Sequence, residues 1–433
     1  MPSGRLGRPF VLLFTSSTIS NLGDGVTIVA LPLLVATLTR DPTTVAGLAL
    51  VSRLPWLLFA LPVGALTDRL DRKRVMCQAN LFRAAAMGGL AVAVATDTIT
   101  IWLLYALALL IGIAEVFYDN SAQAFLPQIV APALLARANG RLFAAATVTN
   151  EFAGPPLGAL MFSAAVAAPF VLDATSFAVT VPLLWAIAGR FRPATEAGAA
   201  PRHLGREIMA GLRWLWSHRL LRLLAILLGL ANFANTAAFS ILVLFAQDEL
   251  GASDVEFGLL ITAGAVGAVA GGLLAGRVTD RFGSGPALVA TFLTFAVVQT
   301  SVGLVSQLWV VAALFAVNGV ATIVWNVITV SLRQTVIPPA LLGRVNSVYR
   351  FVGWGAIPLG ALAGGLLAAA IGLRGTYVVT GLALVAVGLA AAPLLLRSAA
   401  ELDSGATSSL DSVAEGDQAP AVHHDGGAGD PAS

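Results

Sequence analysis

Twelve long apolar runs dominate this chain, and they limit its fold more than any other feature. A helix needs about 20 mostly apolar residues to cross the hydrocarbon of a bilayer. The runs that meet this length cover residues 10–36, 44–67, 75–95, 99–122, 142–165, 168–189, 221–246, 256–275, 287–306, 309–332, 347–370 and 375–396. They are continuous and rich in Leu, Ala and Gly, whereas the strands of a membrane β-barrel alternate apolar and polar residues. The sequence therefore predicts an all-α membrane protein with twelve transmembrane helices.

The basic residues predict the orientation of the chain. Only 11% of all residues are charged, and the mean hydropathy is +0.86. Of the 25 Lys and Arg residues, 21 lie before the first run or in the loops after the even-numbered runs. Arg40 and Arg374 lie on the other side, and Arg53 and Arg83 lie within runs. Because Lys and Arg accumulate in cytoplasmic loops, we expect both termini in the cytoplasm. The first run has no small-residue cleavage site, so we do not expect a removable signal peptide.

Three pairs of similar segments indicate an internal duplication. The pairs are 64–69 with 276–281, 132–139 with 339–346, and 156–160 with 358–362. They lie in the same order in both halves, at offsets of 212, 207 and 202 residues. We therefore expect two six-helix bundles, at 1–189 and 221–397. Repeated bundles of this kind occur in transporters, which handle their substrates between the halves.

Two segments lie outside the bundles. Residues 190–220 begin as a flexible linker and end in a basic amphipathic helix, with Ile208, Leu212, Leu215 and Trp216 on one stripe. This helix either lies on the inner membrane surface or extends the seventh span into the cytoplasm. Residues 398–433 contain seven acidic residues and many Gly, Ala, Ser and Pro, which predicts a disordered tail.

Charged loops follow the second and eighth runs. Gly64, Asp68 and Arg69 of the first loop correspond to Gly276, Asp280 and Arg281 of the second, and Arg72 follows the first set. A carboxylate at one helix end can interact with the N-terminal dipole of another helix and with nearby arginines. Such a contact exists only while the inner ends of the halves lie together, so we interpret these residues as a conformational latch. For Arg72, Lys73 and Arg74 the simpler explanation is that they fix the topology.

At this loop the chain resembles the major facilitator superfamily, whose second loop carries a Gly-x-Leu-Ala-Asp-Arg-x-Gly-Arg-Arg type of pattern. Here residues 64–74 are Gly-Ala-Leu-Thr-Asp-Arg-Leu-Asp-Arg-Lys-Arg. Asp71 replaces the usual second glycine, so the turn there is expected to differ. The resemblance covers all twelve runs and implies the major facilitator fold, but it does not identify a substrate.

The fifth run carries a second pattern of this kind. The segment Gly154-Pro155-Pro156-Leu157-Gly158 resembles the Gly-Pro-x-x-Gly pattern of antiporters in the superfamily, which implies export. Glycine and proline let helices approach closely and kink, as a rocking interface requires, although helix packing alone explains them equally well. Residues 19–26, 53–74 and 173–177 (Asp-Ala-Thr-Ser-Phe) resemble the macrolide- and enterobactin-exporter-like branch.

Charged residues inside the runs are candidates for proton coupling, because a charge in the membrane is costly and usually functional. Five of them are weighed as candidates, namely Asp24, Arg53, Glu115, Asp119 and Glu151. Asp24 and Arg53 reach comparable depths, so they can pair for coupling or for neutralisation alone. Glu151 lies near the middle of the fifth run.

Glu115 and Asp119 are four residues apart, hence on one helical face. Two close carboxylates disfavour each other's charge, as a proton carrier requires, although Asp119 can simply be hydrated. Arg83 can pair with them or extend to the inner surface. Better-known drug–proton antiporters have an arginine in the fourth helix, where this chain has Glu115, so their proton relay is not implied.

The second half is poorer in charge, and its polar residues are candidates for a substrate cavity. They are Asn232, Asn235, Asn318, Trp325 and Asn326, although asparagines also join helices by hydrogen bonds. No Gly-rich phosphate loop is present, and the one lysine is Lys73. We therefore expect no ATP-driven pump, enzyme, metal site, cofactor or nucleic-acid partner.

Together these features predict a secondary transporter of a bacterial plasma membrane. We expect a monomer that exports amphipathic small molecules in exchange for protons. Two alternatives stay open, namely proton-coupled uptake of a metabolite and a non-transporting receptor or lipid-handling protein on the same fold.

Overall fold

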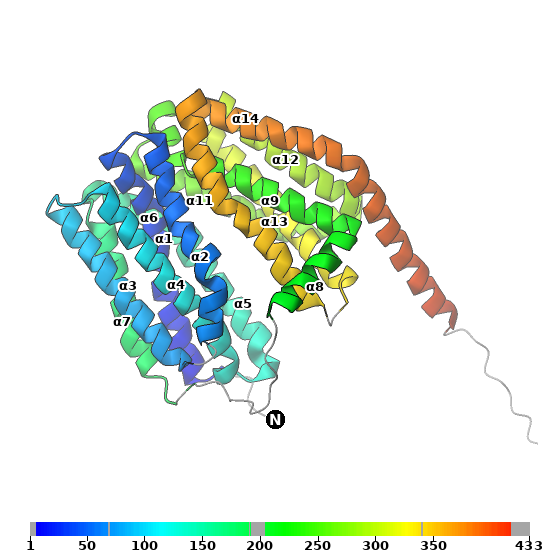
Figure 1. The fold of residues 1–433 in the computed structure, drawn as a ribbon, viewed down its shortest axis with the longest axis horizontal. Helices are drawn as coiled ribbons and strands as arrows, with labels where there is room; N and C mark the ends of the chain where they lie inside the picture. Colours follow the sequence, from blue (N-terminus) through cyan, green and yellow to red (C-terminus); the bar gives the residue numbers. More distant parts are fainter. Residues whose placement is uncertain (1–5, 68–69, 190, 192–203, 339–340, 417–433) are drawn as a thin grey trace, which may run out of the picture.

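The computed structural model describes residues 6–67, 70–189, 191, 204–338 and 341–416 of the 433-residue chain. These residues form helices joined by short turns, with no strand among them (Figure 1). Within the described residues, ten helices are long and apolar enough to cross a membrane. The predicted all-α membrane class is therefore confirmed.

The first half of the chain forms the helices on the left of Figure 1. They are α1 (Arg8–Leu38), α2 (Pro42–Thr67), α3 (Arg72–Ala95), α4 (Ile101–Ile129), the 3₁₀ turn η1 (Pro132–Leu134), α5 (Leu135–Ala146), the π-helix η2 (Thr147–Ala153), α6 (Gly154–Ala164) and α7 (Ala168–Trp185). No gap separates α5, η2 and α6, which together cover nearly all of the predicted fifth run.

The second half forms the helices on the right. They are α8 (Leu204–Ser217), α9 (Arg219–Phe239), α10 (Leu242–Leu244), the π-helix η3 (Phe245–Glu249), α11 (Asp254–Phe282), α12 (Ser284–Leu304), α13 (Leu308–Val336) and α14 (Leu342–Gly416). Two predicted runs lie in α14, and Gly372 breaks the helix between them with a φ of +80°. This left-handed conformation is readily adopted by glycine, which has no Cβ.

Three apolar cores show where the halves join. We call the end of the bundle where α1 begins the near end, and the end with the loop between α1 and α2 the far end. One core lies toward the far end and combines residues of both halves, including Val29, Phe170 and Phe245. At the near end each half has a separate core. The halves are therefore packed together at the far end and apart at the near end.

Contacts between the halves run mainly through α2 with α14 and α6 with α11. Small residues allow this approach. A methyl group on Gly365 of α14 would lie 2.9 Å from Thr43 Cα, and one on Gly258 of α11 would lie 2.9 Å from the Pro155 carbonyl oxygen. Both are closer than van der Waals contact, so these interfaces depend on glycine.

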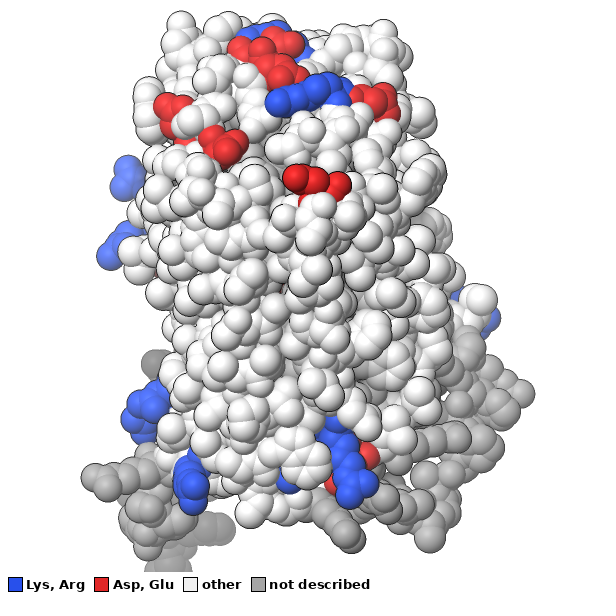
Figure 2. Space-filling view, turned by 90° about the vertical axis from the view of Figure 1, so that its left-hand side faces the viewer, with Lys and Arg blue, Asp and Glu red and all other residues white. Residues whose placement is uncertain are grey.

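Charged side chains gather at the far end, while the middle of the face in Figure 2 is almost free of them. Asp41 lies just before α2. It accepts hydrogen bonds from Thr44 N (2.8 Å), from Thr44 Oγ1 (2.6 Å) and from the Thr43 hydroxyl. These bonds lower the pKa of Asp41 to about 2. The carboxylate therefore stays charged, and keeps this helix start bonded, well into the acidic range.

The structure separates α8 from α9. His218 between them has an extended conformation, and its side chain accepts a hydrogen bond from Leu221 N. Leu215 of α8 is fully buried, and α8 packs against α14. The helix is thus not a straight extension of the seventh span. At the other end, α14 continues as helix to Gly416, where the sequence predicts a disordered tail, and residues 417–433 lie outside the described residues.

Candidate functional site

An ion pair lies inside the first half, between α1 and α3. Arg83 Nη2 is 2.6 Å from Asp24 Oδ1, and only 3% of the Arg83 side chain is exposed. The guanidinium also lies over the Phe177 ring, 3.9 Å from its centroid. The predicted pairing of Asp24 with Arg53 is therefore wrong. Because α2 packs mainly against α4 and α14, Arg53 is not directed at α1 and is exposed.

Further carboxylates surround this ion pair. The charges of Glu115 and Asp119 on α4 and of Asp173 on α7 act on Arg83, in addition to that of Asp24. Among the described residues Arg83 bonds Asp24, so its predicted pairing with the α4 carboxylates stays a prediction. Four acidic side chains from three helices thus share one buried arginine, and we call these five residues the Arg83 cluster.

Asp173 is the member that the sequence analysis did not weigh as a site. It is fully buried, and its Oδ2 accepts a hydrogen bond of 2.7 Å from Thr27 Oγ1 on α1. A carboxylate within an apolar run is itself a signal of function, and Asp173 begins the Asp-Ala-Thr-Ser-Phe segment. The sequence therefore contained the signal that would have found it.

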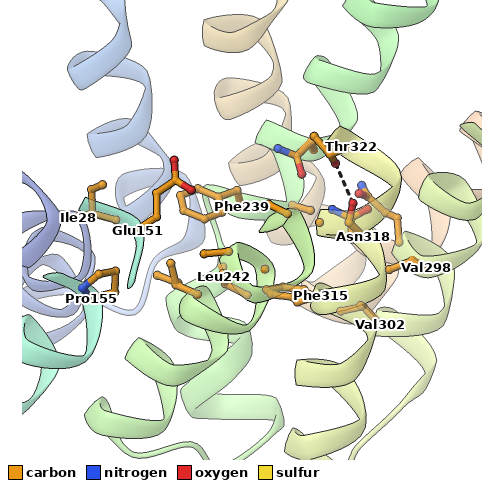
Figure 3. Close-up of a pocket in the computed structure, with 18 of the residues that line it drawn as sticks. Ile28, Glu151, Pro155, Phe239, Leu242, Val298, Val302, Phe315, Asn318 and Thr322 are labelled. Carbon is orange, nitrogen blue, oxygen red and sulfur yellow. Dashed lines mark hydrogen bonds between the residues drawn. The ribbon is translucent and has the colours of Figure 1, made fainter. Parts of the chain in front are cut away.

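A second candidate site is a cavity of about 420 Å³ between the halves (Figure 3). Its polar lining includes Asn150, Glu151, Asn235, Gln299, Asn318 and Thr322. The rest is mostly apolar, with Phe239, Leu242 and Phe315 prominent in the view. Of the described lining residues, Glu151 alone carries a carboxylate. The cavity thus presents a large apolar surface, several amides and one acidic group.

Glu151 lies on η2, where the helix widens to a π-helix just before the Gly-Pro-Pro segment. Short π-helical turns inside longer helices frequently occur at functional sites. The Glu151 side chain is exposed, and Pro155 of the following helix also lines the cavity. The structure thus places the predicted mid-membrane glutamate at the boundary between the two halves.

The predicted cavity residues of the second half divide into two groups. Asn235 and Asn318 line the cavity. The other three do not, since Asn232 donates to the Gly353 carbonyl oxygen (2.8 Å), Trp325 packs on Phe292 in the core, and Asn326 is exposed elsewhere. Gln299 lines the cavity but was missed. It is buried and donates to the Ala234 carbonyl oxygen (2.8 Å) and to Thr380 Oγ1 (2.9 Å).

The Gly-Pro-Pro-Leu-Gly segment lies against α1. A methyl group on Gly154 would collide with the backbone of Gly25, and one on Gly158 would lie 2.9 Å from Val26 Cα. The two helices therefore touch backbone to backbone. The same segment meets α11 of the other half through Pro155, so it joins α1 to the interface between the halves.

The charged loop after α2 falls partly outside the described residues, which exclude Asp68 and Arg69. Arg72 donates to the Ala124 carbonyl oxygen (2.7 Å), and Gly64 is half-buried. Asp71 caps α3 by accepting from Arg74 N (3.2 Å), and it also accepts from Phe191 N (3.3 Å). The residue that stands in place of the usual glycine, Asp71, therefore acts as the N-cap of α3.

Lys73 is buried and donates to the Ile187 carbonyl oxygen (2.9 Å). This lysine ties α3 to the segment after α7, a structural role that topology alone did not predict. In the second loop, Gly276, Asp280 and Arg281 are exposed at the near end of α11. Because the near ends are apart, the structure does not test the latch.

No group of three His, Cys, Asp or Glu side chains that could hold a metal ion occurs within the described ranges. The single cysteine, Cys77, is buried and free.

The chain matches a family model described as "Transmembrane secretion effector" over residues 7–427. It is 29% identical to the multidrug efflux pump Tap of Mycobacterium tuberculosis strain H37Rv, over 95% of this chain and 98% of the relative. It is 22% identical to macrolide efflux protein A of Streptococcus pyogenes, over 88% of this chain and 94% of the relative.

Solved structures share the fold. A bacterial homologue of the human lysosomal transporter Spinster superposes with a TM-score of 0.68 at 15% identity, over 91% of this chain and 98% of that one. A bacterial homologue of the iron transporter ferroportin superposes with a TM-score of 0.66 at 18% sequence identity, over 90% of this chain and 99% of that one.

Proposed function

Because the chain belongs to the transmembrane secretion effector family of the major facilitator superfamily, whose members are transporters and not enzymes, we propose that it is a proton-coupled exporter of amphipathic small molecules. The observation that carries this proposal is the cavity between the halves, whose lining is apolar with amides and one carboxylate. Relatives that are efflux pumps for multiple drugs or macrolides support the same direction.

We infer twelve spans in two six-helix halves. Ten helices meet the length and hydropathy of a span within the described residues. The continuous α5–η2–α6 segment supplies one more, and α14 supplies two spans instead of one because of the break at Gly372. The paired contacts α2–α14 and α6–α11 support a pseudo-twofold relation, because α2 corresponds to α11 and α6 to the first part of α14, so each contact is the counterpart of the other. An even number of spans places both termini on the same side, which the basic loops assign to the cytoplasm.

We further infer that transport proceeds by alternating access. The shared far-end core and separate near-end cores correspond to a conformation open toward the cytoplasm. Each chain has a complete cavity between its own halves, which supports a monomer as the functional unit.

A contact across the far end would then close the outer gate. Arg40 after α1 donates to Gln247 Oε1 (2.8 Å) and lies 3.2 Å from Asp248 Oδ1 on η3. Arg374 in turn holds Glu249 of η3, with 2.6 Å between Nε and Oε2. Arg40 and Arg374 are the two basic residues that the sequence places outside, and both bind the same short helix. η3 is therefore tied to both halves.

Replacing Arg40 by Ala is expected to favour the outward-open state. Both partners of the Arg40–Asp248 pair are about half exposed, and an exposed pair contributes at most about 1 kcal/mol, so the population should shift by no more than about fivefold. The measurement is the rate at which an impermeant maleimide added outside labels Asn318→Cys in a Cys77→Ser background. The exchanged pair Arg40→Asp with Asp248→Arg serves as the control and should restore slow labelling. Equal rates in Arg40→Ala and the parent would contradict the gate.

The proposed proton coupling rests on the Arg83 cluster and Glu151. We expect the combined Glu115→Gln and Glu151→Gln variant to lose most transport driven by a pH gradient, because two proton-binding groups are then absent. Inverted membrane vesicles measure this as substrate uptake with and without the gradient. Asp97→Asn, an exposed loop carboxylate whose left-handed φ of 54° asparagine tolerates, is the matched control. Driven uptake equal to the wild type in the double variant would exclude these two glutamates as coupling groups.

The same inverted vesicles distinguish export from the two alternatives, which are proton-coupled uptake and a receptor or lipid-handling role. An exporter that exchanges substrate for protons makes an acidified lumen more alkaline when substrate is added, whereas a proton symporter acidifies it. A receptor or lipid-handling protein gives neither response.

A further inference from the structure

Asp173 is enclosed more completely than the other carboxylates of the Arg83 cluster. Its exposed fraction is 0%, and α1 approaches it so closely that a methyl group on Gly23 would collide with Asp173 Oδ1 and Ser176 Oγ. An ionised carboxylate in such a place needs a cation or several donors. The candidate cation is Arg83, which is bonded to Asp24 in this structure.

The hydrogen bonds around Asp173 indicate its protonation state. A hydroxyl group has one hydrogen to donate. Ser176 Oγ lies 2.8 Å from the Asp173 main-chain oxygen, which takes that hydrogen, and 3.2 Å from Asp173 Oδ1. The longer contact to Oδ1 therefore receives only a share of that hydrogen. Thr27 Oγ1 supplies its hydrogen to Oδ2. Asp173 thus receives one full hydrogen bond and a share of a second, which is less than a fully buried ionised carboxylate needs, so these surroundings favour the neutral acid.

Arg83 has bonding capacity to spare. Its Nε is buried without a hydrogen-bond partner among the described residues, and only Nη2 is bonded to Asp24. The charged and titratable groups that face the cluster are Asp24 on α1, Arg83 on α3, Glu115, Tyr118 and Asp119 on α4, and Asp173 on α7. One guanidinium can neutralise one buried carboxylate at a time, so the others must bind protons or water.

We propose that Asp173 carries a transported proton and that Arg83 changes partner between Asp24 and Asp173 during the cycle. In this structure Asp24 is ionised and paired, and Asp173 is protonated. When Asp24 takes a proton from water, its ion pair with Arg83 breaks. Arg83 then pairs with Asp173, whose O–H bond breaks and whose proton passes to water. The exchange links α1 and α7 through the arginine on α3. It deepens the proposed antiport and rests on it.

The test is Asp173→Asn, which copies the neutral acid in shape and hydrogen bonding. We expect the purified variant in proteoliposomes to retain substrate exchange at equal concentrations on both sides. We expect transport driven by a pH gradient to fall by about tenfold or more, and its pH dependence to disappear. Asp97→Asn is the control for a carboxylate-to-amide change and should behave as the wild type.

Infrared difference spectra provide a measurement that does not depend on transport. The wild type at neutral pH should show the carbonyl band of a protonated carboxylic acid that is absent from Asp173→Asn. Should that variant not fold, Ser176→Ala replaces it, and we expect the band to shift because the acid loses a hydrogen-bond partner. A missing band overturns the proposal. The proposal is also overturned if Asp173→Asn shows gradient-driven transport equal to that of the wild type. It is likewise overturned if the folded variant loses exchange and gradient-driven transport to the same extent. A wild type without gradient-driven transport would instead refute the proposed function itself.

Discussion

Replacing Arg83 by Gln should destabilise the protein by about 3 kcal/mol. Breaking a buried ion pair by removing one partner costs about 3–5 kcal/mol, because the other charge stays buried without compensation. The lower end applies here, since about 30% of the Asp24 side chain is exposed and can be hydrated. The loss of the contact with the Phe177 ring acts in the same direction. Thermal unfolding of the detergent-solubilised protein measures the effect.

The partner substitution provides the control. Asp24→Asn added to Arg83→Gln removes the second charge as well, so we expect it to recover a large part of the lost stability. Gradient-driven transport should nevertheless stay absent in the double variant, because the partner exchange at Arg83 is gone. If the double variant is no more stable than Arg83→Gln, then Asp24 is not the charge that Arg83 neutralises.

Gly158→Leu should have an effect at least as large. A side chain at this position collides with the backbone of Val26, and a backbone cannot rotate away as a side chain can. We expect α6 to separate from α1, with loss of most folded protein or a destabilisation of about 3 kcal/mol or more. Membrane yield and melting temperature measure this.

Gly140→Leu is the matched control for this substitution. Gly140 lies in α5, which continues through η2 into α6, and a Cβ there would meet nothing within 4 Å. We expect near-normal yield. Equal yields of the two leucine variants would mean that the close approach of α6 to α1 does not hold the fold together.

The sequence predicted the membrane class and the intramembrane charges, but it did not predict which helices meet. Asp24 and Arg53 lie at comparable depths along their helices, and depth was the only geometry that the sequence offered. Pairing depends on the packing around α1, which places α7 beside α1 and α3 against α7, so that the long Arg83 side chain reaches Asp24 from α3. Arg83 is therefore the partner. Asp173 was overlooked because its helix contributes no other charge, although a single carboxylate in an apolar run was sufficient reason to consider it.

The polar residues of the second half show the same limit of sequence-based prediction. Asn235 and Asn318 face the cavity, whereas Asn232 satisfies a carbonyl of α14 and Trp325 fills a core. The residue types are the same in both roles, so only the rotation of each helix decides between them. Asp71 departs from the family pattern, and the structure shows that its side chain caps α3. The expectation that this turn differs from the turn in the family stays a prediction.

The most direct test of proton-coupled export is accumulation of amphipathic compounds by bacteria that lack their own efflux pumps. Cells expressing this chain should accumulate less of at least one compound in a chemically varied panel than cells with an empty vector. An uncoupler that collapses the proton gradient should abolish the difference. Lower accumulation that persists with the uncoupler, or no difference for any compound in the panel, would contradict proton-coupled export.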